Sequence, residues 1–365
     1  MSCLIVGAGI SGIVAAEQLS KKGFKITIIE KRNHIGGNCY DYVDEETGIL
    51  VNKYGAHLFH TNNEEVWAYV NSFDKWVPWE HEVVSSIDGQ FVPMPVNIIT
   101  VNSLCDENIQ TEAEMLLWLS SNQIPCTNPN NSEETALSRI GHVLYEKLVK
   151  DYTFKQWNKY PAELDKSVLE RIPVRSNFDC RYFTDKYQAL PAMGYTHFFE
   201  QILKNPNIQV LLETDYFTFP EKNFDFTIFT GPIDSYFLGE KLEYRSINFH
   251  REVFKDTSFY QPNSVVNYPS AEVPFTRIVE YKHFLNQKSK DTIIFKETSC
   301  SDGEPYYPVL NKKNLELYEN YRLLAKKEES QNVFFIGRLA NYKYFNMDEA
   351  ILNSLRFVKS LGSRL

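Results

Sequence analysis

The sequence predicts an α/β fold in which the two ends of the chain build one unit. The chain opens with an apolar strand, an amphipathic helix and a second apolar strand, at residues 3–7, 11–22 and 25–30. It closes with an apolar strand at 333–336, a glycine and a helix over 347–361. Alternating strands and helices are typical of a parallel sheet covered by helices. We therefore expect both ends in that sheet and the middle of the chain inserted between them.

The middle of the chain combines a helical stretch with scattered strands. Helical character runs from residue 112 to 165, broken by an Asn- and Pro-rich loop at 127–132. Within this stretch, residues 112–120 are acidic and Leu-rich, and residues 136–149 show the helical period. Strand-like runs occur at residues 82–87, 209–212, 225–229 and 292–295.

Length and composition narrow the function. At 365 residues the chain exceeds the size at which single cores stop growing, about 250–300 residues, so we expect two or more packing units. With 38 Lys and Arg against 47 Asp and Glu, the net charge is −9, which does not favour nucleic acid or an anionic membrane as partner. Aromatic residues are frequent, at 14%, and indicate a large core.

The cysteines predict neither a metal site nor a disulfide framework. The six are scattered, without a CxxC pair: Cys3, Cys39, Cys105, Cys126, Cys180 and Cys300. Residues 1–12 form a short apolar strand that runs into glycines, unlike a secretory signal, and no run of about 18 apolar residues could span a membrane. We therefore expect reduced cysteines in a cytoplasmic protein.

A glycine-rich turn follows the first strand and opens the first helix. Gly7 permits the tight turn, Gly9 lets backbone N–H groups approach a pyrophosphate, and Gly12 lets the helix pack on the strand. The helix N-terminus adds partial positive charge, and Glu30 can accept hydrogen bonds from a ribose. This arrangement predicts a Rossmann-like dinucleotide-binding domain, against the alternative of a purely structural turn. The expected contacts within the turn are Gly7, Gly9, Ile10, Ser11 and Gly12.

The residues after Glu30 favour FAD over NAD as the cofactor. A glycine pair, Gly36-Gly37, follows shortly after, and such a pair resembles the extended FAD fingerprint of flavoprotein oxidases. Near the C-terminus, Gly337 and Arg338 follow an apolar strand, so a cation and a helix N-terminus can face a flavin. We predict FAD, with NAD as the alternative. The contacts expected here are Lys31, Arg32, Gly37, Asn38, Gly337 and Arg338.

Several motifs far apart in the chain have no role in an ordinary oxidoreductase. They are residues 54–62, 152–157, 172–175, 267–268, 273–278, 304–308, 337–339 and 342–348. Together with the FAD fingerprint, this set closely resembles the bacterial UDP-galactopyranose mutases. The resemblance extends from about residue 3 to about residue 350.

The resemblance implies both a fold and a chemistry. Family members combine an FAD-binding α/β domain with a helical domain and an antiparallel sheet domain, and the substrate lies in the cleft between them. They interconvert UDP-galactopyranose and UDP-galactofuranose for cell-surface polysaccharides, without net oxidation. Reduced flavin is required, because its N5 attacks the anomeric carbon and forms a covalent sugar adduct as the nucleotide diphosphate leaves. NAD(P)H or another reductant would supply the electrons, and the family usually forms homodimers.

The implied domains are discontinuous along the chain. The expected ranges are 1–75, 200–242 and 325–365 for the FAD-binding α/β domain, 76–97, 172–199 and 243–324 for the sheet and substrate domain, and 98–171 for the helical domain. No single cut separates them, because the middle of the chain is inserted into the α/β unit.

The resemblance also assigns residues to the substrate. Arg175 and Arg277 match two arginines that grip the diphosphate, for which guanidinium groups are well suited. Tyr152 should stack on the uracil, and Trp157 should sit against the sugar and the substrate loop. The other expected substrate contacts are Tyr187, Asn267, Tyr306, Tyr307, Tyr344 and Asn346.

Other matched residues should lie beside the flavin. His60 should hydrogen-bond the flavin edge or its ribityl chain, and Arg338 should neutralise charge near the reduced flavin. With Arg175 and Arg277 they form the expected catalytic set. The further expected flavin contacts are Tyr54, Gly55, His57, Tyr344 and Met347. No general base is obvious, so the flavin itself should handle the proton that ring opening requires.

Three positions depart from the common family pattern and leave the sugar and the base open. Residues 148–149 are Leu-Val where many members carry two phenylalanines, Ala340 replaces a glycine, and Asn346 replaces a frequent aspartate. These changes also allow a mutase for dTDP-fucose or UDP-N-acetylgalactosamine. We further expect the segment 178–187, with Arg175 at its root, to close over bound substrate.

Two other function classes compete with a mutase. A flavin amine oxidase or desaturase would reduce its flavin with substrate and release hydrogen peroxide, but two diphosphate-binding arginines do not suit an amine substrate. A non-enzymatic regulator would bind FAD or a nucleotide sugar without turnover. Neither would isomerise a sugar, so an isomerisation assay separates both from the first hypothesis.

Overall fold

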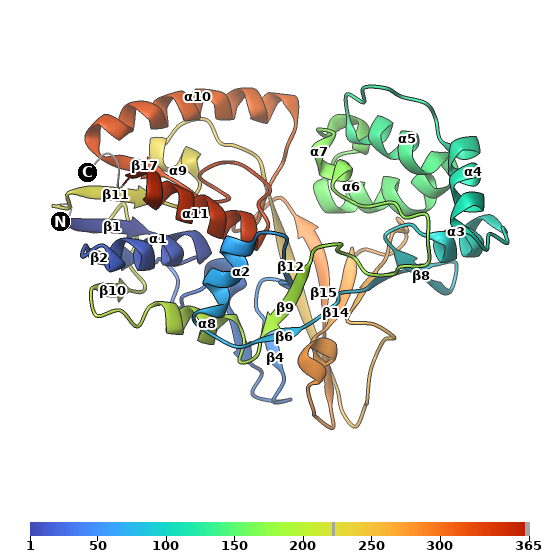
Figure 1. Ribbon diagram of the computed structural model, residues 1–365, viewed down its shortest axis with the longest axis horizontal. Coiled ribbons are helices and arrows are strands. Elements are labelled where there is room, and N and C mark those ends of the chain that lie inside the picture. Colours follow the sequence, from blue (N-terminus) through green and yellow to red (C-terminus); the bar gives the residue numbers. More distant parts are fainter. Residues whose placement is uncertain (221–222, 362–365) are drawn as a thin grey trace.

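The computed structural model describes residues 1–220 and 223–361, and its largest α/β unit is built around a parallel sheet (Figure 1). The strand order in this sheet is β10-β2-β1-β11-β17. The strands are β1 (Ser2–Val6), β2 (Lys25–Ile29), β10 (Ile208–Leu211), β11 (Phe226–Phe229) and β17 (Val333–Phe335). Both ends of the chain therefore contribute to one sheet, which confirms the predicted fold class.

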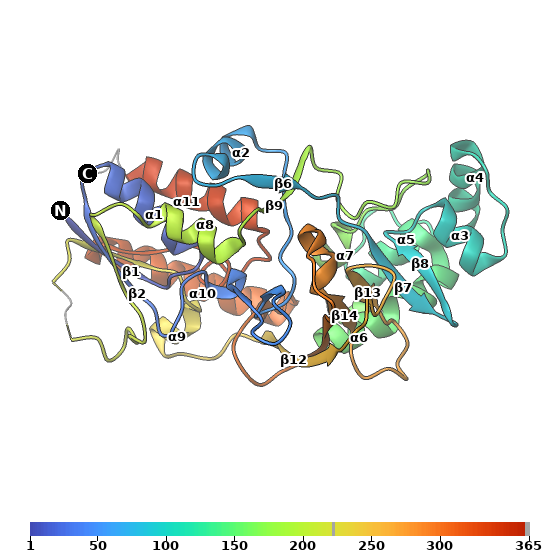
Figure 2. The ribbon, with the colours of Figure 1, turned by 90° about the horizontal axis from the view of Figure 1, so that it is seen from below.

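Helices cover both faces of the parallel sheet (Figure 2). Strand β17 packs against helices on both faces, because neighbouring side chains of a strand point to opposite faces, as Phe334 and Phe335 do. Phe334 packs in the cluster that contains Val358 of α11, whereas Phe335 packs against the cluster of Tyr321 and Ile233 from α10 and α9. The helices of this unit are α1 (Ile10–Lys21), α2 (Glu64–Asn71), α8 (Tyr195–Ile202), α9 (Ile233–Phe237), α10 (Lys312–Glu328) and α11 (Met347–Leu361).

A seven-stranded, mostly antiparallel sheet forms the middle of the molecule, in the order β16-β12-β15-β14-β13-β7-β8. Its register aligns Asn267, Arg277 and Glu297 in one row across three neighbouring strands. Side chains in such a row lie on the same face of a sheet. The strands are β7 (Val83–Ile87), β8 (Gln90–Met94), β12 (Tyr244–Phe254), β13 (Val265–Asn267), β14 (Arg277–Glu280), β15 (Thr292–Cys300) and β16 (Tyr307–Pro308).

The helical layer packs around its own apolar core beside this sheet (Figure 1). Its chain turns sharply at Gly141, which has a φ of 72° and lies so close to α4 that a Cβ there would be 2.3 Å from the carbonyl oxygen of Asn122. The helices are α3 (Ile98–Cys105), α4 (Glu112–Asn122), α5 (Ser132–Leu144), a π-helical turn η2 (Tyr145–Lys150), α6 (Asp151–Trp157) and α7 (Ser167–Glu170).

Two small sheets join these units. One pairs β3 (Asp41–Val43) with β4 (Leu50–Asn52), and the other has the order β5 (Phe59–Thr61), β9 (Tyr187–Pro191), β6 (Trp76–Pro78). Short 3-10 turns complete the path: η1 (Gly37–Cys39), η3 (Pro161–Glu163), η4 (Tyr281–Asn286) and η5 (Glu329–Gln331). Among the described residues, no helix has the length and apolar character needed to cross a bilayer.

The structure contains two long elements that the sequence patterns did not predict, β12 and α10. Along β12, polar and charged residues occupy much of the exposed half, so no apolar run marks it. In α10, Asn314 and Tyr321 are the buried residues, which leaves almost no apolar stripe at the helical period. The residue boundaries of the three implied domains stay a prediction.

Candidate active site

The glycine turn between β1 and α1 forms one wall of the site. Gly7 has a φ of 105°, which favours glycine, and a Cβ on Gly12 would lie 2.1 Å from the carbonyl oxygen of Gly7. A Cβ on Gly9, in contrast, would meet only Gly37 Cα, at 3.8 Å. Within residues 1–220 and 223–361, no side chain caps the start of α1 at Gly9, so the first N–H groups of the helix stay open to an anion.

Glu30 closes β2 beside this turn and is almost fully buried, at 7% exposure. Its two carboxylate oxygens accept hydrogen bonds from the backbone N–H groups of Ala8, at 2.8 Å, and Arg32, at 2.9 Å. Glu30 therefore fixes the turn to the end of β2. Because each carboxylate oxygen can accept more than one hydrogen bond, it can still accept from a ribose hydroxyl.

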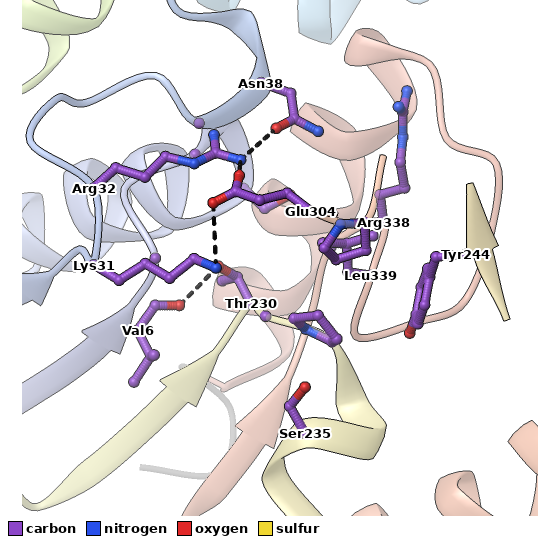
Figure 3. Close-up of a pocket in the computed structure, with 18 of the residues that line it drawn as sticks. Val6, Lys31, Arg32, Asn38, Thr230, Ser235, Tyr244, Glu304, Arg338 and Leu339 are labelled. Atoms are coloured by element: carbon purple, nitrogen blue, oxygen red, sulfur yellow. Dashed lines mark hydrogen bonds and ion pairs between the residues drawn. The ribbon is translucent and has the colours of Figure 1, made fainter. Parts of the chain in front are cut away.

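A cavity of about 760 Å³ opens between the parallel sheet and the loops next to the ends of its strands (Figure 3). This volume lies in the range of ligand cavities, roughly 300–1,000 Å³. Most of the predicted cofactor residues line it: Gly7, Gly9, Ile10, Ser11, Glu30, Lys31, Arg32, Gly37, Asn38, His57, Gly337, Arg338 and Met347. Asn346, predicted as a substrate contact, lines it too. The predicted cofactor residues that do not are Gly12, Tyr54, Gly55 and Tyr344.

The C-terminal wall of the cavity begins at the end of β17. Gly337 has a φ of 98°, and a Cβ there would lie 2.9 Å from Ser11 Oγ, so glycine permits β17 to end against α1. The next residue, Arg338, donates from Nε to the carbonyl oxygen of Phe345 at 3.0 Å. Its guanidinium carbon lies 5.3 Å from the ring centre of Tyr344. Arg338 thus faces both the cavity and the aromatic cluster next to it.

An acidic residue from the loop between β15 and β16 reaches across the cavity (Figure 3). Glu304 accepts from Arg32 and forms an ion pair with Lys31 at 3.5 Å. Arg32 also donates to Asn38 at 3.0 Å, and its guanidinium lies 4.3 Å from the ring centre of Tyr54. Burial opposes it, but Arg32 and Lys31 hold the pKa of Glu304 below its ordinary value. The sequence patterns contained Glu304 in a motif but did not single it out.

Beside the cavity, aromatic side chains from three parts of the chain form a cluster. The rings of Tyr307 and Tyr344 stack with centres 5.4 Å apart and an interplanar angle of 10°. Trp157, from α6, lies 6.2 Å from Tyr307 and 6.3 Å from Tyr344. These three predicted substrate residues are therefore brought together by the fold.

Arg277 enters this cluster from the central sheet. Its Nε donates to Glu297 at 2.6 Å, and Glu297 is fully buried while the Arg277 side chain is 25% exposed. Asn267, the neighbour in the same cross-strand row, accepts from the Tyr152 hydroxyl at 3.5 Å. Burial raises the pKa of Tyr152, and Arg277 is the strongest group that opposes this rise. Two further predicted contacts, Tyr152 and Asn267, thus lie with Arg277.

A residue that the sequence patterns missed, Arg171, completes the cluster. Its guanidinium carbon lies 3.9 Å from the ring centre of Tyr344. Burial raises the pKa of Tyr344, but Arg171 and Arg338 outweigh burial, and the pKa falls below its ordinary value. The available signal was a second arginine four residues before Arg175.

The charges of this cluster do not cancel. Three guanidinium groups, those of Arg171, Arg277 and Arg338, surround the two stacked tyrosines, whereas Glu297 is the carboxylate that bonds to one of them. Among the described residues, these four groups therefore leave an excess of positive charge beside the cavity. Such a surplus, with planar donor groups, is suited to a diphosphate.

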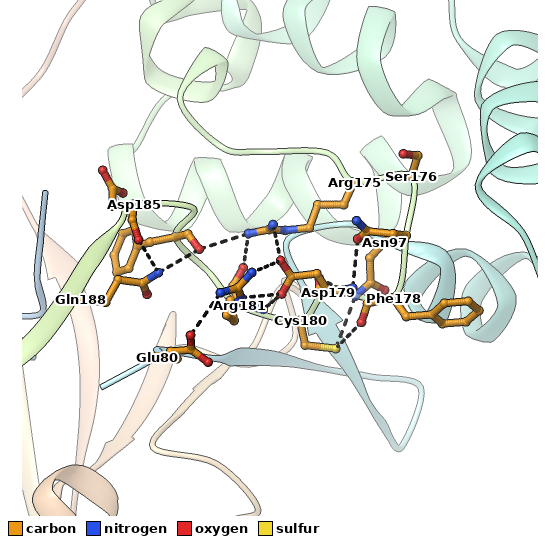
Figure 4. A network of polar contacts seen from close by, with 12 residues as sticks. Glu80, Asn97, Arg175, Ser176, Phe178, Asp179, Cys180, Arg181, Asp185 and Gln188 are labelled. Atoms are coloured by element: carbon orange, nitrogen blue, oxygen red, sulfur yellow. Dashed lines mark hydrogen bonds and ion pairs between the residues drawn. The ribbon is translucent and has the colours of Figure 1, made fainter. Parts of the chain in front are cut away.

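Arg175 is held elsewhere in this structure (Figure 4). It donates from Nη1 to Asp179 at 2.8 Å and from Nη2 to the carbonyl oxygens of Arg181 and Phe183. Its side chain is buried, and its Nε has no hydrogen-bond partner among the described residues. The structure brings Arg277 into the cluster with Arg171 and Arg338, whereas Arg175 stays with its own loop. A contact of Arg175 with the diphosphate stays a prediction.

Besides Arg175, several predicted residues lie away from the cavity lining and from the stacked tyrosines. His60 is paired with Asp185 at 2.9 Å and stacks on Phe183, with ring centres 3.7 Å apart. Tyr187 stacks on Trp67, at 4.6 Å between ring centres, and donates to Glu64 at 2.7 Å. Tyr306 packs 5.9 Å from Tyr54, whose hydroxyl lies 2.7 Å from His34 Nε2. Gly55 lies against the sheet, where a Cβ would be 3.3 Å from Glu297 Oε1.

His57 lines the cavity as a neutral imidazole. Burial, together with the nearby Arg338 and Arg277, lowers its pKa to about 4, although a hydrogen bond with Gly55 opposes them. The ring Nδ1 lies 2.8 Å from the carbonyl oxygen of Gly55. At neutral pH this side chain is therefore uncharged and is not a proton donor in the sense of an imidazolium.

The fold and the site define a class of protein: a dinucleotide-binding α/β protein with a cationic, tyrosine-lined site beside its cofactor cavity. A family model for UDP-galactopyranose mutase matches residues 147–344, and one for an NAD(P)-binding Rossmann-like domain matches residues 5–73. The first match covers more than half of the chain. The chain belongs to the UDP-galactopyranose mutase family.

Individual relatives agree with this assignment. A probable UDP-galactopyranose mutase from Klebsiella pneumoniae is 38% identical over 359 residues, covering 97% of this chain and 92% of the relative. A dTDP-fucopyranose mutase from Escherichia coli is also 38% identical, over 365 residues and 96% of each chain. Among solved structures, a reduced UDP-galactopyranose mutase superposes with a TM-score of 0.80 at 18% identity, covering 100% of this chain and 96% of that one. The last comparison supports the fold alone.

The assignment makes this protein an isomerase with a flavin-type fold that acts on nucleotide sugars. It agrees with the resemblance that the scattered motifs indicated. The two relatives with equal identity carry different substrate names, so the particular sugar is a separate question.

Proposed function

We propose that this protein interconverts UDP-galactopyranose and UDP-galactofuranose, with reduced FAD as its cofactor, in the synthesis of cell-surface polysaccharide. The observation that carries the proposal is the cluster of Arg171, Arg277 and Arg338 around Tyr307 and Tyr344, directly beside the cofactor cavity. A site for a diphosphate next to a site for a dinucleotide is what a nucleotide sugar and a flavin require together.

The cavity fits FAD by the chemistry of its walls. The space that a Cβ on Gly9 would enter and the uncapped start of α1 suit a pyrophosphate, and Glu30 suits a ribose. Arg338 would lie beside the flavin. When bound and reduced, the flavin would supply the nucleophile for the anomeric carbon, and NAD(P)H or another reductant would reduce it.

The residues of this chain would bind the nucleotide and stabilise it as it leaves. Arg277 and Arg171 would neutralise the diphosphate, whose charge grows when its bond to the sugar breaks. The hydroxyl groups of Tyr307 and Tyr344 would donate hydrogen bonds beside them. Tyr152 would stack on the base, a contact worth roughly 1–3 kcal/mol. Because His57 is neutral, it would not serve as the acid at neutral pH.

Arg175 would join the cluster only after its loop moves. The loop holds it through Asp179 and two carbonyl oxygens, so entry into the site requires that these bonds break. We propose that the segment 178–187 closes over bound nucleotide and releases Arg175. Limited proteolysis of the segment with and without UDP tests this, since unchanged cleavage would contradict closure.

A second candidate substrate is dTDP-fucopyranose. The relative of that name is as similar to this chain as the UDP-galactopyranose mutase from Klebsiella pneumoniae. Asn346, which lines the cavity, replaces a charged residue frequent in the family. We also propose a homodimer in the cytoplasm, as is usual in the family, and sedimentation of the pure protein tests the dimer.

The test is an isomerisation assay on purified protein. We expect a yellow protein that, after reduction with dithionite, converts UDP-galactofuranose to UDP-galactopyranose and does nothing when oxidised. A parallel assay with the dTDP-fucose pair decides between the two substrates. Release of hydrogen peroxide on an amine, without isomerisation, would instead favour an oxidase. A folded, flavin-loaded protein that isomerises neither sugar would refute the proposal.

A further inference from the structure

Lys155 on α6 reaches the loop that joins β13 to β14. Its Nζ donates to four backbone carbonyl oxygens, those of Tyr268, Ser270 at 2.8 Å, Val273 at 3.0 Å and Phe275 at 3.0 Å. All four belong to residues 268–276, the segment between the two strands. All four acceptors are therefore carbonyl oxygens of a single loop.

The contact surrounds a cation with carbonyl oxygens, which we call a caged cation. An ammonium group carries three N–H bonds, which are shared here among four acceptors. Burial lowers the pKa of Lys155 to about 8, while Asp151, one turn earlier, opposes this, so the group is charged at neutral pH. The dipoles of four carbonyl groups, and not the charge of a carboxylate, therefore stabilise its positive charge.

The other bonds of the loop lie mostly at its ends. Tyr268 N donates to Thr276 O at 2.8 Å, and Thr276 donates from N and Oγ1 to the carbonyl oxygen of Glu297 on β15, at 2.8 and 3.0 Å. In the middle, Val273 N donates to Ser270 O at 3.3 Å, and residues 270–272 and 274 are exposed. A loop of this kind needs outside contacts to keep one conformation, because ordering each residue costs about 1–2 kcal/mol. Lys155 supplies such contacts from α6.

The two ends of the loop belong to the candidate active site. Asn267 directly precedes it and Arg277 directly follows it. The helix that carries Lys155 also carries Tyr152, which donates to Asn267, and Trp157 of the aromatic cluster. Figures 1 and 2 both show α6 beside this part of the sheet. A shift of the loop would therefore move Arg277 relative to the residues on α6.

We propose that Lys155 is a positioning residue, which locks the loop 268–276 onto α6 by a cage of carbonyl oxygens and so holds Asn267 and Arg277 in place. Lys155 is not one of the described residues that line the cofactor cavity. The contact between Lys155 and the loop is a property of the fold. Its effect on nucleotide binding rests on the proposed function.

The first test measures the loop itself. In the flavin-loaded protein without nucleotide, Lys155→Met should raise amide hydrogen exchange in residues 268–276 by about tenfold or more, since several charge-assisted hydrogen bonds are lost. Lys150→Met is the matched control, because Lys150 is a more exposed lysine on the preceding turn that pairs with Glu146 at 2.9 Å. Unchanged exchange in Lys155→Met, or an equal change in the control, would overturn the proposal.

The second test measures the consequence for the site. Lys155→Met should raise the Kd for UDP about tenfold and leave the flavin spectrum unchanged. In the background of Arg277→Ala the same change should have a much smaller effect, because only Asn267 remains of the two residues that it positions. Equal losses in both backgrounds would mean that Lys155 does not act through Arg277 and would overturn that part of the proposal.

Two outcomes keep this proposal separate from the proposed function. If Lys155→Met does not fold, Lys155→Arg, which keeps the charge and the donors, should fold and show less exchange in 268–276 than Lys155→Gln. Exchange in the arginine variant as high as in the glutamine variant would count against a caged cation. If the natural protein binds no UDP but the exchange result holds, the proposed function fails while the positioning role stands.

Discussion

The cofactor cavity and the arginine–tyrosine cluster offer different chemistry to a ligand. The cavity is built around backbone: Gly7, Gly9 and Gly12 shape a turn whose N–H groups need no charged side chain. The cluster is built from side chains, with Arg171 and Arg277 brought next to Tyr344 from separate elements. A glycine turn selects by shape and close approach, whereas the cluster selects by charge. The two regions should therefore fail in different ways when they are altered.

The largest effect is expected in the backbone site. Gly9→Ala should leave the fold intact, because Gly9 has an ordinary φ of −80° and its Cβ would meet only Gly37 Cα, at 3.8 Å. The methyl group would occupy the space needed by a pyrophosphate, so we expect almost no bound flavin and no turnover. Visible absorbance per mole of protein and circular dichroism measure the two properties. Gly12→Ala is the contrast, since its Cβ would lie 2.1 Å from Gly7 O and should disrupt the fold.

Loss of one charge in the cluster should have the next largest effect. Arg277→Ala should reduce turnover by on the order of a hundredfold while the protein stays yellow. It also leaves the fully buried Glu297 without its ion pair, which should cost on the order of 3 kcal/mol of unfolding free energy. The double variant Arg277→Ala/Glu297→Gln should regain stability but not turnover. Normal turnover in either variant would separate Arg277 from the reaction.

Arg171 sharpens the comparison because it acts on a neighbour. Arg171→Met should raise the pKa of Tyr344, since the guanidinium over its ring lowers it, and should weaken UDP binding about tenfold. Ultraviolet titration of tyrosinate, with Tyr344→Phe to assign the signal, measures the first effect. Arg322→Met, at an exposed ion pair on α10, is the matched control. A weaker affinity without a change in tyrosine titration would contradict this electrostatic role.

The smallest effect concerns pH and stability. Burial lowers the pKa of His81 to about 3, while its ordinary value is 6.5. Above pH 6.5 the group is neutral in both states, but below it the unfolded chain takes up a proton first. Stability should therefore fall as pH drops from 6.5 towards 3, by up to about 1.4 kcal/mol per pH unit.

A substitution isolates this contribution. The thermal midpoint of His81→Gln should depend less on pH between 7 and 4.5 than that of the natural protein. His142→Gln is the control, because His142 is an exposed histidine on α5. Equal pH slopes in all three proteins would rule His81 out as a source of acid sensitivity.

Features formed by residues close together in the sequence could be predicted, whereas features that depend on distant contacts could not. The turn at Gly7, Gly9 and Gly12 was predictable, because strand, turn and helix follow one another and each glycine has a local reason. The position of Arg171 was not predictable, because Arg171 lies only four residues before Arg175 and both residues precede the same loop. Which guanidinium reaches Tyr344 depends on the carboxylate and the carbonyl oxygens that hold Arg175 in its own loop.

By itself, the sequence determined the α/β class, the cofactor turn and, through its scattered motifs, the family. These depend on local spacing, which a chain carries without being folded. Only the tertiary structure decided that Arg277 stands in a row with Asn267 and Glu297, that Glu304 crosses to Arg32, and that Lys155 is caged by a loop more than a hundred residues away. Strand register and helix packing decide such contacts, because they place side chains that no local pattern relates.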